Sequence, residues 1–316
     1  MKLKHVLESQ QFRRNDLEEL FLQADCIARL LKSPQGRRQL KKLLSGRLMC
    51  ALFYEPSTRT RSSYEIGGQR LGMDVVSTEN AAEFSSAAKG ETLRDTIRVI
   101  AGYGIDLIVL RHREDGASKV AAETCDELGF PTHIFNAGDG RGQHPTQALL
   151  DMYTIRSECR DRQIDGLTVM IGGDLANGRT VRSLAYMLSR YKSRLIFVSP
   201  PPLAIGDDIK AYLNRHCIEF REETNPRKVF SEADVVYWTR IQRERIADPR
   251  LRRRRFTEFV ISPAEMALMH PLPRVDEITQ AVDADPRAAY FRQATNGLYV
   301  RMALLTQVFG VKLPPA

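Results

Sequence analysis

Short apolar runs that alternate with helical patterns constrain the fold of this chain more than any other feature. The runs cover residues 48–53, 106–111, 167–171, 195–198 and 234–238. They are short and mostly continuous, which is typical of strands buried on both faces of a parallel sheet. Segments between them carry apolar residues at helical spacing. This alternation predicts an α/β fold of parallel βαβ units and doubly wound sheets.

Polar and cationic residues gather where these predicted strands end. In doubly wound sheets, ligands bind beyond the carboxyl ends of the strands. The residues at such ends are 57–61, Arg111, 174–179 and Arg240. We therefore expect these residues to contribute to a binding site.

The segment Ser57-Thr58-Arg59-Thr60-Arg61 lies between a predicted strand and a predicted helix. Hydroxyl groups and helix N–H groups converge there, and the helix dipole favours an anion. The planar guanidinium group of Arg59 suits phosphate. The alternative interpretation is an ordinary helix cap beside solvated arginines.

The composition indicates acidic partners. Lys and Arg number 47 against 39 Asp and Glu, so the formal charge is +8. Such a balance suits nucleic acid or small polyanions. No apolar run reaches the length of a membrane span, so no membrane partner is expected.

The cysteines and the N-terminal residues predict a cytoplasmic protein. The five cysteines are scattered and form no Cys-x-x-Cys pair, as expected of reduced thiols rather than disulfides or metal ligands. The first residues contain no apolar core of a signal peptide. Glu8, Asp16, Glu18 and Glu19 argue against an organelle transit peptide.

Two further strand ends carry an arginine. Residues 171–179 contain glycines but lack the Gly-x-Gly-x-x-Gly spacing, so nicotinamide binding is not expected. Arg179 begins the next predicted helix and could bind a carboxylate. Arg240 lies in the polar and cationic segment 238–245, and together the two guanidinium groups would suit a substrate with two carboxylates. The alternative for this segment is a solvated charge run.

His144 and Gln147 place an imidazole and an amide at a predicted helix start. His144 could donate to a carbonyl oxygen on which negative charge develops, and the alternative is a structural histidine. No other His, Cys or carboxylate has metal-ligand spacing to His144, so no metal site is expected. The prolines of residues 270–274 free carbonyl groups from sheet pairing, and such carbonyls can accept hydrogen bonds from a ligand NH₂.

Taken together, these motifs resemble those of the carbamoyltransferase superfamily, and the resemblance covers nearly the whole chain. Residues 57–61 and 144–147 resemble motifs of the superfamily. Residues 239–242 and 270–274 resemble the catalytic chains of aspartate carbamoyltransferases, whereas ornithine enzymes carry His-Cys-Leu-Pro at the latter position.

Two other segments indicate a subgroup. Residues 78–92 and 285–291 are most similar to the plant-type form of this family.

The resemblance implies how two substrates would bind. The phosphate of carbamoyl phosphate would be held by Ser57, Thr58, Arg59, Thr60 and Arg111. Its carbonyl would be polarised by Thr60, Arg111 and His144 as the amine of L-aspartate attacks. Its NH₂ group would bind Gln147 and the carbonyls of Leu272 and Pro273, and the aspartate carboxylates would bind Arg179, Arg240 and Gln242. No cofactor is implied and no general base is evident, so the substrate phosphate would take the amine proton.

The resemblance also implies a domain arrangement and an assembly. It implies two doubly wound domains joined by linking helices, with a C-terminal helix that returns to the first domain. Residues 1–148, completed by residues 294–316, would bind carbamoyl phosphate, and residues 149–293 would bind aspartate. Ser85 and Lys89 would reach into a neighbouring subunit's site, so the active unit would be a homotrimer. The product, N-carbamoyl-L-aspartate, would serve pyrimidine biosynthesis.

Three other hypotheses stay open on the sequence. The acceptor could be an amine other than aspartate. The chain could be an inert ligand-binding relative, since the segment between Arg245 and His270 looks shorter than in the family. Residues 250–255 carry five arginines and could bind nucleic acid, but no aromatic residues are interleaved with them.

Overall fold

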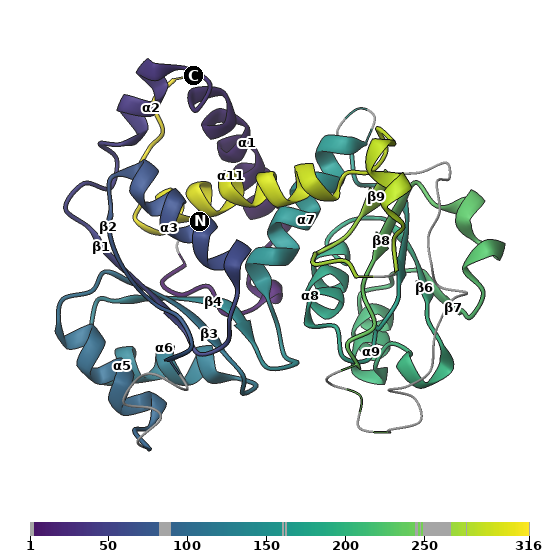
Figure 1. Cartoon of the computed structure of the whole chain (residues 1–316), viewed down its shortest axis with the longest axis horizontal. Coiled ribbons are helices and arrows are strands. Elements are labelled where there is room, and N and C mark those ends of the chain that lie inside the picture. Colours follow the sequence, from purple (N-terminus) through teal and green to yellow (C-terminus); the bar gives the residue numbers. More distant parts are fainter. Residues whose placement is uncertain are drawn as a thin grey trace. The chain divides into compact units, whose positions relative to one another are not determined.

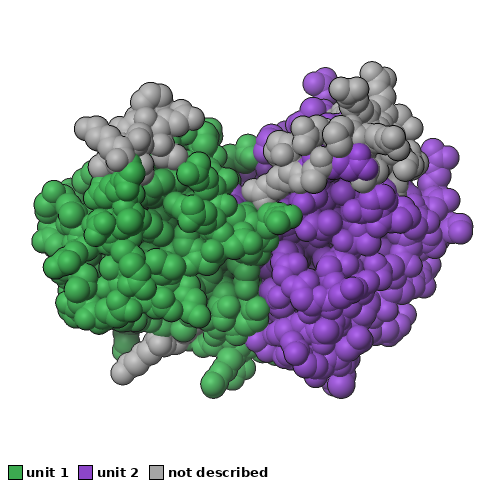
Figure 2. All heavy atoms as spheres, turned by 90° about the horizontal axis from the view of Figure 1, so that it is seen from below, with its two compact units in different colours: residues 1–150, 295–316 green, residues 151–294 purple. Residues whose placement is uncertain are grey.

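Two units of the chain are each built around a parallel β-sheet with helices on its faces (Figure 1). A computed structural model describes residues 3–81, 90–159, 161, 163–243, 246, 248, 267–275 and 277–315. Unit 1 contains residues 1–150 and 295–316, and unit 2 contains residues 151–294, as the colours of Figure 2 show.

Unit 1 has a four-stranded sheet in the order β2-β1-β3-β4, with every pairing parallel. Its strands are β1 (Leu48–Phe53), β2 (Asp74–Thr78), β3 (Leu107–His112) and β4 (His133–Asp139). Its helices are α1 (Arg14–Leu30), α2 (Pro34–Leu40), α3 (Thr58–Leu71), α5 (Leu93–Gly102) and α6 (Ala117–Glu127). The central strands β1 and β3 are almost wholly buried, as their continuous apolar runs predict. The strand order reverses between them, which is where doubly wound sheets bind ligands.

Unit 2 has a five-stranded sheet in the order β7-β6-β5-β8-β9, again with parallel pairings. Its strands are β5 (Thr168–Gly172), β6 (Arg194–Val198), β7 (Phe220–Glu223), β8 (Val235–Trp238) and β9 (Ala267–Met269). Its helices include α8 (Arg179–Leu188) and α9 (Asp207–Arg215). Here the strand order reverses between β5 and β8, so the second predicted ligand edge lies beyond these two strands.

Two helices contain the boundaries between the units. They are α7 (Pro145–Glu158) and α11 (Tyr290–Val308). The C-terminal part of α11 belongs to unit 1, so the chain returns to its first unit at the end. The predicted fold class, two doubly wound parallel-sheet domains, is confirmed.

Each unit has its own apolar core. Ile97, Ile108 and Ile134 belong to the core of unit 1, and Trp238 and Tyr290 belong to the core of unit 2. The wholly buried Trp238 and Tyr290 are among the largest side chains in the protein that water does not reach. Aromatic side chains of this size bury more apolar area than any others and contribute strongly to a core.

We expect the stability of unit 1 to fall as the pH drops below the ordinary histidine pKa of 6.5. Burial lowers the pKa of His5, His112 and His133 in the folded chain. The unfolded chain therefore binds more protons than the folded chain as the pH falls, so the contribution is fully present above that pH and is lost below it. Thermal unfolding midpoints at about pH 7.5 and about pH 5.5 measure the loss.

Glutamine variants separate this effect from general acid sensitivity. Replacing His5, His112 and His133 with glutamine should flatten the pH dependence, whereas replacing the exposed His216 of unit 2 should leave it unchanged. An unaltered slope in the triple variant would contradict the assignment.

Candidate active site

The turn between β1 and α3 offers backbone donors to an anion. Ser57 is the N-cap residue of α3, its hydroxyl makes no capping hydrogen bond, and the first turn contains no acidic residue. The N–H groups at the start of a helix lack helical acceptors, so they can donate to a bound phosphate. Arg61 is occupied elsewhere, because its guanidinium contacts Glu65 and Glu79, each at 2.9 Å. Of the two arginines in this turn, Arg59 rather than Arg61 is therefore the one whose charge can meet an anion.

The side chains of this turn differ in burial. Thr58 and Arg59 are exposed, Ser57 is half-buried and Thr60 is 6% exposed. Desolvation by neighbouring atoms lowers the pKa of the Arg59 guanidinium, although the residue is exposed. An arginine remains protonated at neutral pH despite such a shift. Arg59 is therefore a partly desolvated positive charge, which binds an anion more strongly than a fully hydrated one.

Arg111 lies at the carboxyl end of β3, directly opposite Phe53 of β1. Its side chain is 15% exposed, its Nη1 donates to Ala137 O at 3.1 Å, and its Nη2 lies 3.6 Å from Glu55 Oε2. These contacts fix the guanidinium plane beside the β1–α3 turn. The structure thus places Arg111 and the Ser57 turn at the carboxyl ends of adjacent strands of the same sheet.

His144 and Gln147 lie at the start of α7. His144 is 4% exposed, and its carbonyl accepts the N–H of Gln147 at 3.0 Å. Pro145 is the first helical residue, a position where the missing N–H carries no cost. Residues three apart in a helical turn share a face, so the imidazole and the amide lie on one side of the first turn.

Gly172, the last residue of β5, and Gly173 allow close packing against Trp238 and Thr239. A Cβ atom at Gly172 would lie 2.0 Å from the Trp238 ring, and one at Gly173 would lie 2.1 Å from Thr239 O. Gly173 also has a φ of +104°. These contacts bring the carboxyl ends of β5 and β8 together.

Asp174 organises this edge of unit 2. Its side chain is fully buried and accepts the N–H of Asn177 at 3.0 Å and the N–H of Gln242 at 3.1 Å. It therefore joins the loop before α8 to the segment that holds Arg240 and Gln242. Arg179, the first residue of α8, is 7% exposed. The sequence motifs assign Asp174 no separate role. An acidic residue in a glycine loop before a helix is nevertheless a signal for a carboxylate that binds nearby backbone N–H groups.

We expect Gly173→Ala to lower the free energy of unfolding by about 2–4 kcal/mol, from backbone strain and overpacking together. Chemical denaturation monitored at Trp238 measures this loss. Gly166→Ala is the matched control, because Gly166 also has a positive φ, +85°, but open space around its Cβ position. It should cost about 1 kcal/mol. Equal losses in the two variants would show that the contact with Thr239 is unimportant.

The segment after β9 turns sharply before Pro273. Leu272 has a φ of +52°, and the Leu272–Pro273 peptide is cis. The Leu272 N–H donates to His270 Nδ1 at 2.8 Å, and His270 Nε2 lies 2.7 Å from Glu277 Oε1. Burial alone would raise the pKa of Glu277, but hydrogen bonds from His270 and from the Val275 N–H outweigh it, so the pKa is lowered.

The structure thus places the predicted residues in two sets. In unit 1, Ser57, Thr58, Arg59, Thr60 and Arg111 lie beyond β1 and β3, and His144 and Gln147 begin α7. In unit 2, Arg179, Arg240 and Gln242 lie beyond β5 and β8, and Leu272 and Pro273 follow β9. Ser85, Lys89 and the arginine run 250–255 lie outside the described residues.

The described ranges contain no group of three His, Cys, Asp or Glu residues arranged to hold a metal ion. None of the helices in these ranges has the length and apolar character that crossing a bilayer requires.

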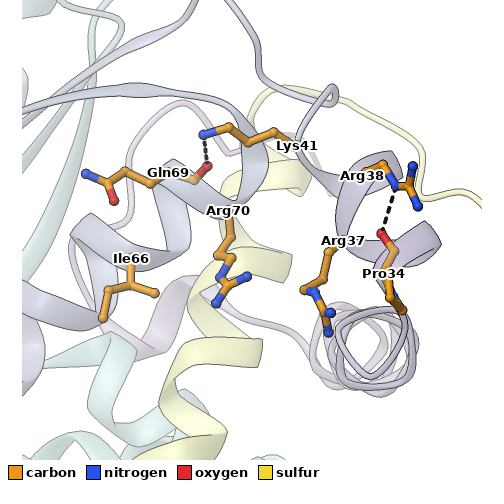
Figure 3. Close-up of a pocket in the computed structure, with 7 residues that line it drawn as sticks. All are labelled: Pro34, Arg37, Arg38, Lys41, Ile66, Gln69 and Arg70. Carbon is orange, nitrogen blue, oxygen red and sulfur yellow. Dashed lines mark hydrogen bonds between the residues drawn. The ribbon is translucent and has the colours of Figure 1, made fainter.

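Unit 1 also has a basic cavity of about 900 Å³ apart from these sets (Figure 3). It is lined by Pro34, Arg37, Arg38, Lys41, Ile66, Gln69 and Arg70. Arg37, Arg38 and Lys41 donate to backbone carbonyls, as when Lys41 Nζ donates to Gln69 O at 2.7 Å. Arg37 and Arg38 lie in the last turn of α2 and Arg70 in the last turn of α3, where cations stabilise helix C-termini. The basic lining therefore has a structural explanation.

Known proteins match the chain over almost its full length. The family model described as aspartate/ornithine carbamoyltransferase, carbamoyl-P binding domain, matches residues 4–157, and the model of the Asp/Orn binding domain matches residues 165–308. The chloroplastic aspartate carbamoyltransferase of Oryza sativa subsp. japonica is 50% identical, in a match that covers 96% of this chain and 85% of the relative.

Solved structures agree with the sequence match. The catalytic subunit of M. jannaschii aspartate transcarbamoylase has a TM-score of 0.86 and 42% identity over 98% of each chain. The Trypanosoma cruzi aspartate transcarbamoylase solved with carbamoyl phosphate and aspartate has a TM-score of 0.87 and 38% identity over 97% of each chain.

The prediction of a cytoplasmic location is wrong. Plant relatives at 50–51% identity are named as chloroplastic enzymes, which contradicts it. Acidic residues between Glu8 and Glu19 do not decide this question, because targeting leaders are removed from mature chains.

Proposed function

The chain belongs to the aspartate/ornithine carbamoyltransferase family, and on this premise we propose that it is an aspartate carbamoyltransferase. It transfers the carbamoyl group of carbamoyl phosphate to the amine of L-aspartate and releases N-carbamoyl-L-aspartate and phosphate, an early step of pyrimidine biosynthesis. The observation that carries this proposal is the 50% identity with a named aspartate carbamoyltransferase over 96% of the chain.

Residues 1–148 with 294–316 would form the carbamoyl-phosphate domain. The α3 N-terminus, with Ser57, Thr58, Arg59 and Thr60, would bind the phosphate through backbone N–H groups and hydroxyls. Arg111 would span the phosphate and the carbamoyl oxygen, because a guanidinium presents several donors in one plane. Its contacts with Ala137 O and Glu55 support this role, since they hold the donor plane before substrate arrives.

The carbamoyl group would be oriented by groups from two helices, one strand and one loop. Thr60, Arg111 and His144 would donate to the carbonyl oxygen, which becomes more negative as the amine attacks. Gln147 and the carbonyls of Leu272 and Pro273 would bind the NH₂ group. The amine nitrogen forms a bond to the carbamoyl carbon, the carbon–oxygen bond to phosphate breaks, and the leaving phosphate takes the amine proton. Catalysis would come mainly from positioning and charge stabilisation.

Residues 149–293 would form the aspartate domain. Arg179, Arg240 and Gln242 would bind the two aspartate carboxylates. Asp174 supports this arrangement by accepting the N–H groups of Asn177 and Gln242, which ties the segment of Arg240 and Gln242 to the loop that leads into Arg179. An ornithine acceptor is disfavoured because two guanidinium groups repel a second ammonium group.

The active unit would be a homotrimer in which Ser85 and Lys89 of one chain complete the site of the next. A single ammonium group from a neighbouring chain can contact a phosphate and a carboxylate together. Sedimentation of the native protein as an active monomer would contradict this assembly.

A phosphonate–aspartate bisubstrate analogue tests the proposal without turnover. Because it carries the recognition groups of both substrates, it should raise the thermal unfolding midpoint of the native protein with a concentration dependence that follows mass action. Phosphate alone should produce a smaller shift. An inert relative would show no shift at any analogue concentration.

A further inference from the structure

Five buried polar side chains of unit 2 form one connected network. They are Asp151 of α7, Tyr237 of β8, His270 and Glu277 after β9, and Gln293 of α11, and each is 5% exposed or less. We call them the buried network. Burying so many polar groups is unfavourable unless their hydrogen bonds are made inside the protein.

The network runs from the sheet to the segment after β9. Tyr237 Oη donates to Asp151 Oδ2 at 2.8 Å, and Gln293 Nε2 donates to Asp151 Oδ1 at 2.6 Å. The other end of the Gln293 amide, Oε1, accepts the backbone N–H of His270 at 2.9 Å. Burial raises the pKa of Tyr237, and the Asp151 charge adds to this effect, so the phenol keeps its proton and remains a donor.

The contacts of His270 define which ring nitrogen carries the proton. Nδ1 accepts the Leu272 N–H at 2.8 Å, so it is unprotonated. The proton of the neutral ring therefore lies on Nε2, which is 2.7 Å from Glu277 Oε1. Glu277 thus selects the tautomer that makes Nδ1 an acceptor for the backbone.

The segment held in this way is conformationally demanding. Leu272 adopts a φ of +52°, a left-handed conformation that residues with a Cβ atom rarely occupy. Such a conformation persists where surrounding contacts determine it. The N–H bonded to His270 belongs to this same residue. The contact therefore acts on the backbone that sets the direction of the Leu272 carbonyl.

We propose that His270, with its tautomer set by Glu277 and its backbone fixed by Gln293 and Asp151, positions the Leu272 and Pro273 carbonyls for the carbamoyl NH₂ group. The proposal rests on the proposed function for what these carbonyls bind. His270 acts through the backbone of Leu272 and does not touch substrate, so it is a positioning residue. If the network only stabilised the core, losing the Nδ1 contact and losing the Nε2 contact of His270 should have the same effect.

Two substitutions of similar size separate these roles. In His270→Asn, the side-chain oxygen takes the place of Nδ1 and can still accept the Leu272 N–H, while the contact with Glu277 is lost. In His270→Gln, the amide nitrogen takes the place of Nε2 and can still reach Glu277, while the acceptor for Leu272 is lost. Both remove one buried contact, so both should cost stability.

Amide hydrogen exchange at Leu272 gives a readout that does not depend on activity. Protection should fall by about tenfold or more in His270→Gln, and it should stay within about threefold of the native value in His270→Asn. If the native protein shows no carbamoyl transfer, the proposed function fails while this comparison still tests the positioning contact.

Steady-state kinetics then connect the contact to the substrate. KM for carbamoyl phosphate should rise about tenfold in His270→Gln and little in His270→Asn, with kcat less affected, since the carbonyls bind the NH₂ group before and during reaction. Binding of inorganic phosphate should be equal in the native protein and both variants. Equal changes in the two variants, in exchange or in KM, would overturn the proposal.

Discussion

Arg111→Ala is expected to lower kcat/KM for carbamoyl transfer by roughly 100- to 1000-fold, because one preorganised donor to a developing oxyanion contributes about 2.7–4 kcal/mol. The side chain is 15% exposed and already held by Ala137 O and Glu55, so the donor plane is in place before the reaction starts. The change should include a lower kcat and not only a higher KM, since the carbamoyl oxygen gains charge in the transition state.

Arg113→Ala is the matched control for this effect. Arg113 lies two residues further along and is exposed. Like Arg111→Ala, Arg113→Ala removes one positive charge from this segment. This variant should leave kcat/KM within about twofold of the native value. A loss below about threefold for Arg111→Ala would show that Arg111 is an ordinary surface charge, since each tenfold corresponds to about 1.36 kcal/mol.

Mixing two inactive variants is expected to restore activity if neighbouring chains share sites. Lys89→Ala and Arg111→Ala chains should each be nearly inactive as pure trimers. In an equal mixture that exchanges subunits, about a quarter of the sites should combine an intact Arg111 with an intact Lys89 from the next chain. Activity should therefore rise towards about a quarter of the native value.

A second pair of variants controls for nonspecific effects of mixing. Arg111 and His144 both belong to unit 1, and in the proposed site both come from the same chain. In a mixture of Arg111→Ala and His144→Ala chains, every site therefore lacks either Arg111 or His144. Mixing these two variants should restore no activity. Recovery in this control, or no recovery in the Lys89 mixture despite proven exchange, would contradict the shared site.

The central strands could be predicted from the sequence because parallel strands buried on both faces are continuously apolar. The run 48–53 coincides with β1, and the run 234–238 begins one residue before β8. β2 and β7 were not predicted, because they lie at sheet edges and expose most of their residues. The apolar run directly before His270 corresponds to β9, which contains only three residues.

The candidate site, like the fold, has parts that the sequence predicts and parts that it does not. Residues at strand ends, such as Arg111 and Arg179, could be located because doubly wound sheets bind ligands there. The contacts that hold the site could not be predicted, because they join positions that are far apart in the sequence. Gln293 and Asp151 are 142 residues apart, and Gln242 and Asp174 are 68 apart. Neither pair has a local pattern that would indicate its partner.

Transfer of the carbamoyl group to a panel of amine acceptors tests the central claim most directly. The purified protein is incubated with carbamoyl phosphate and either L-aspartate or L-ornithine, and both carbamoylated product and released phosphate are measured. We predict rapid, stoichiometric formation of N-carbamoyl-L-aspartate and phosphate, inhibition by the bisubstrate analogue, and little reaction with ornithine. Faster turnover of ornithine than aspartate, or no turnover of either together with no binding of the analogue, would contradict the account.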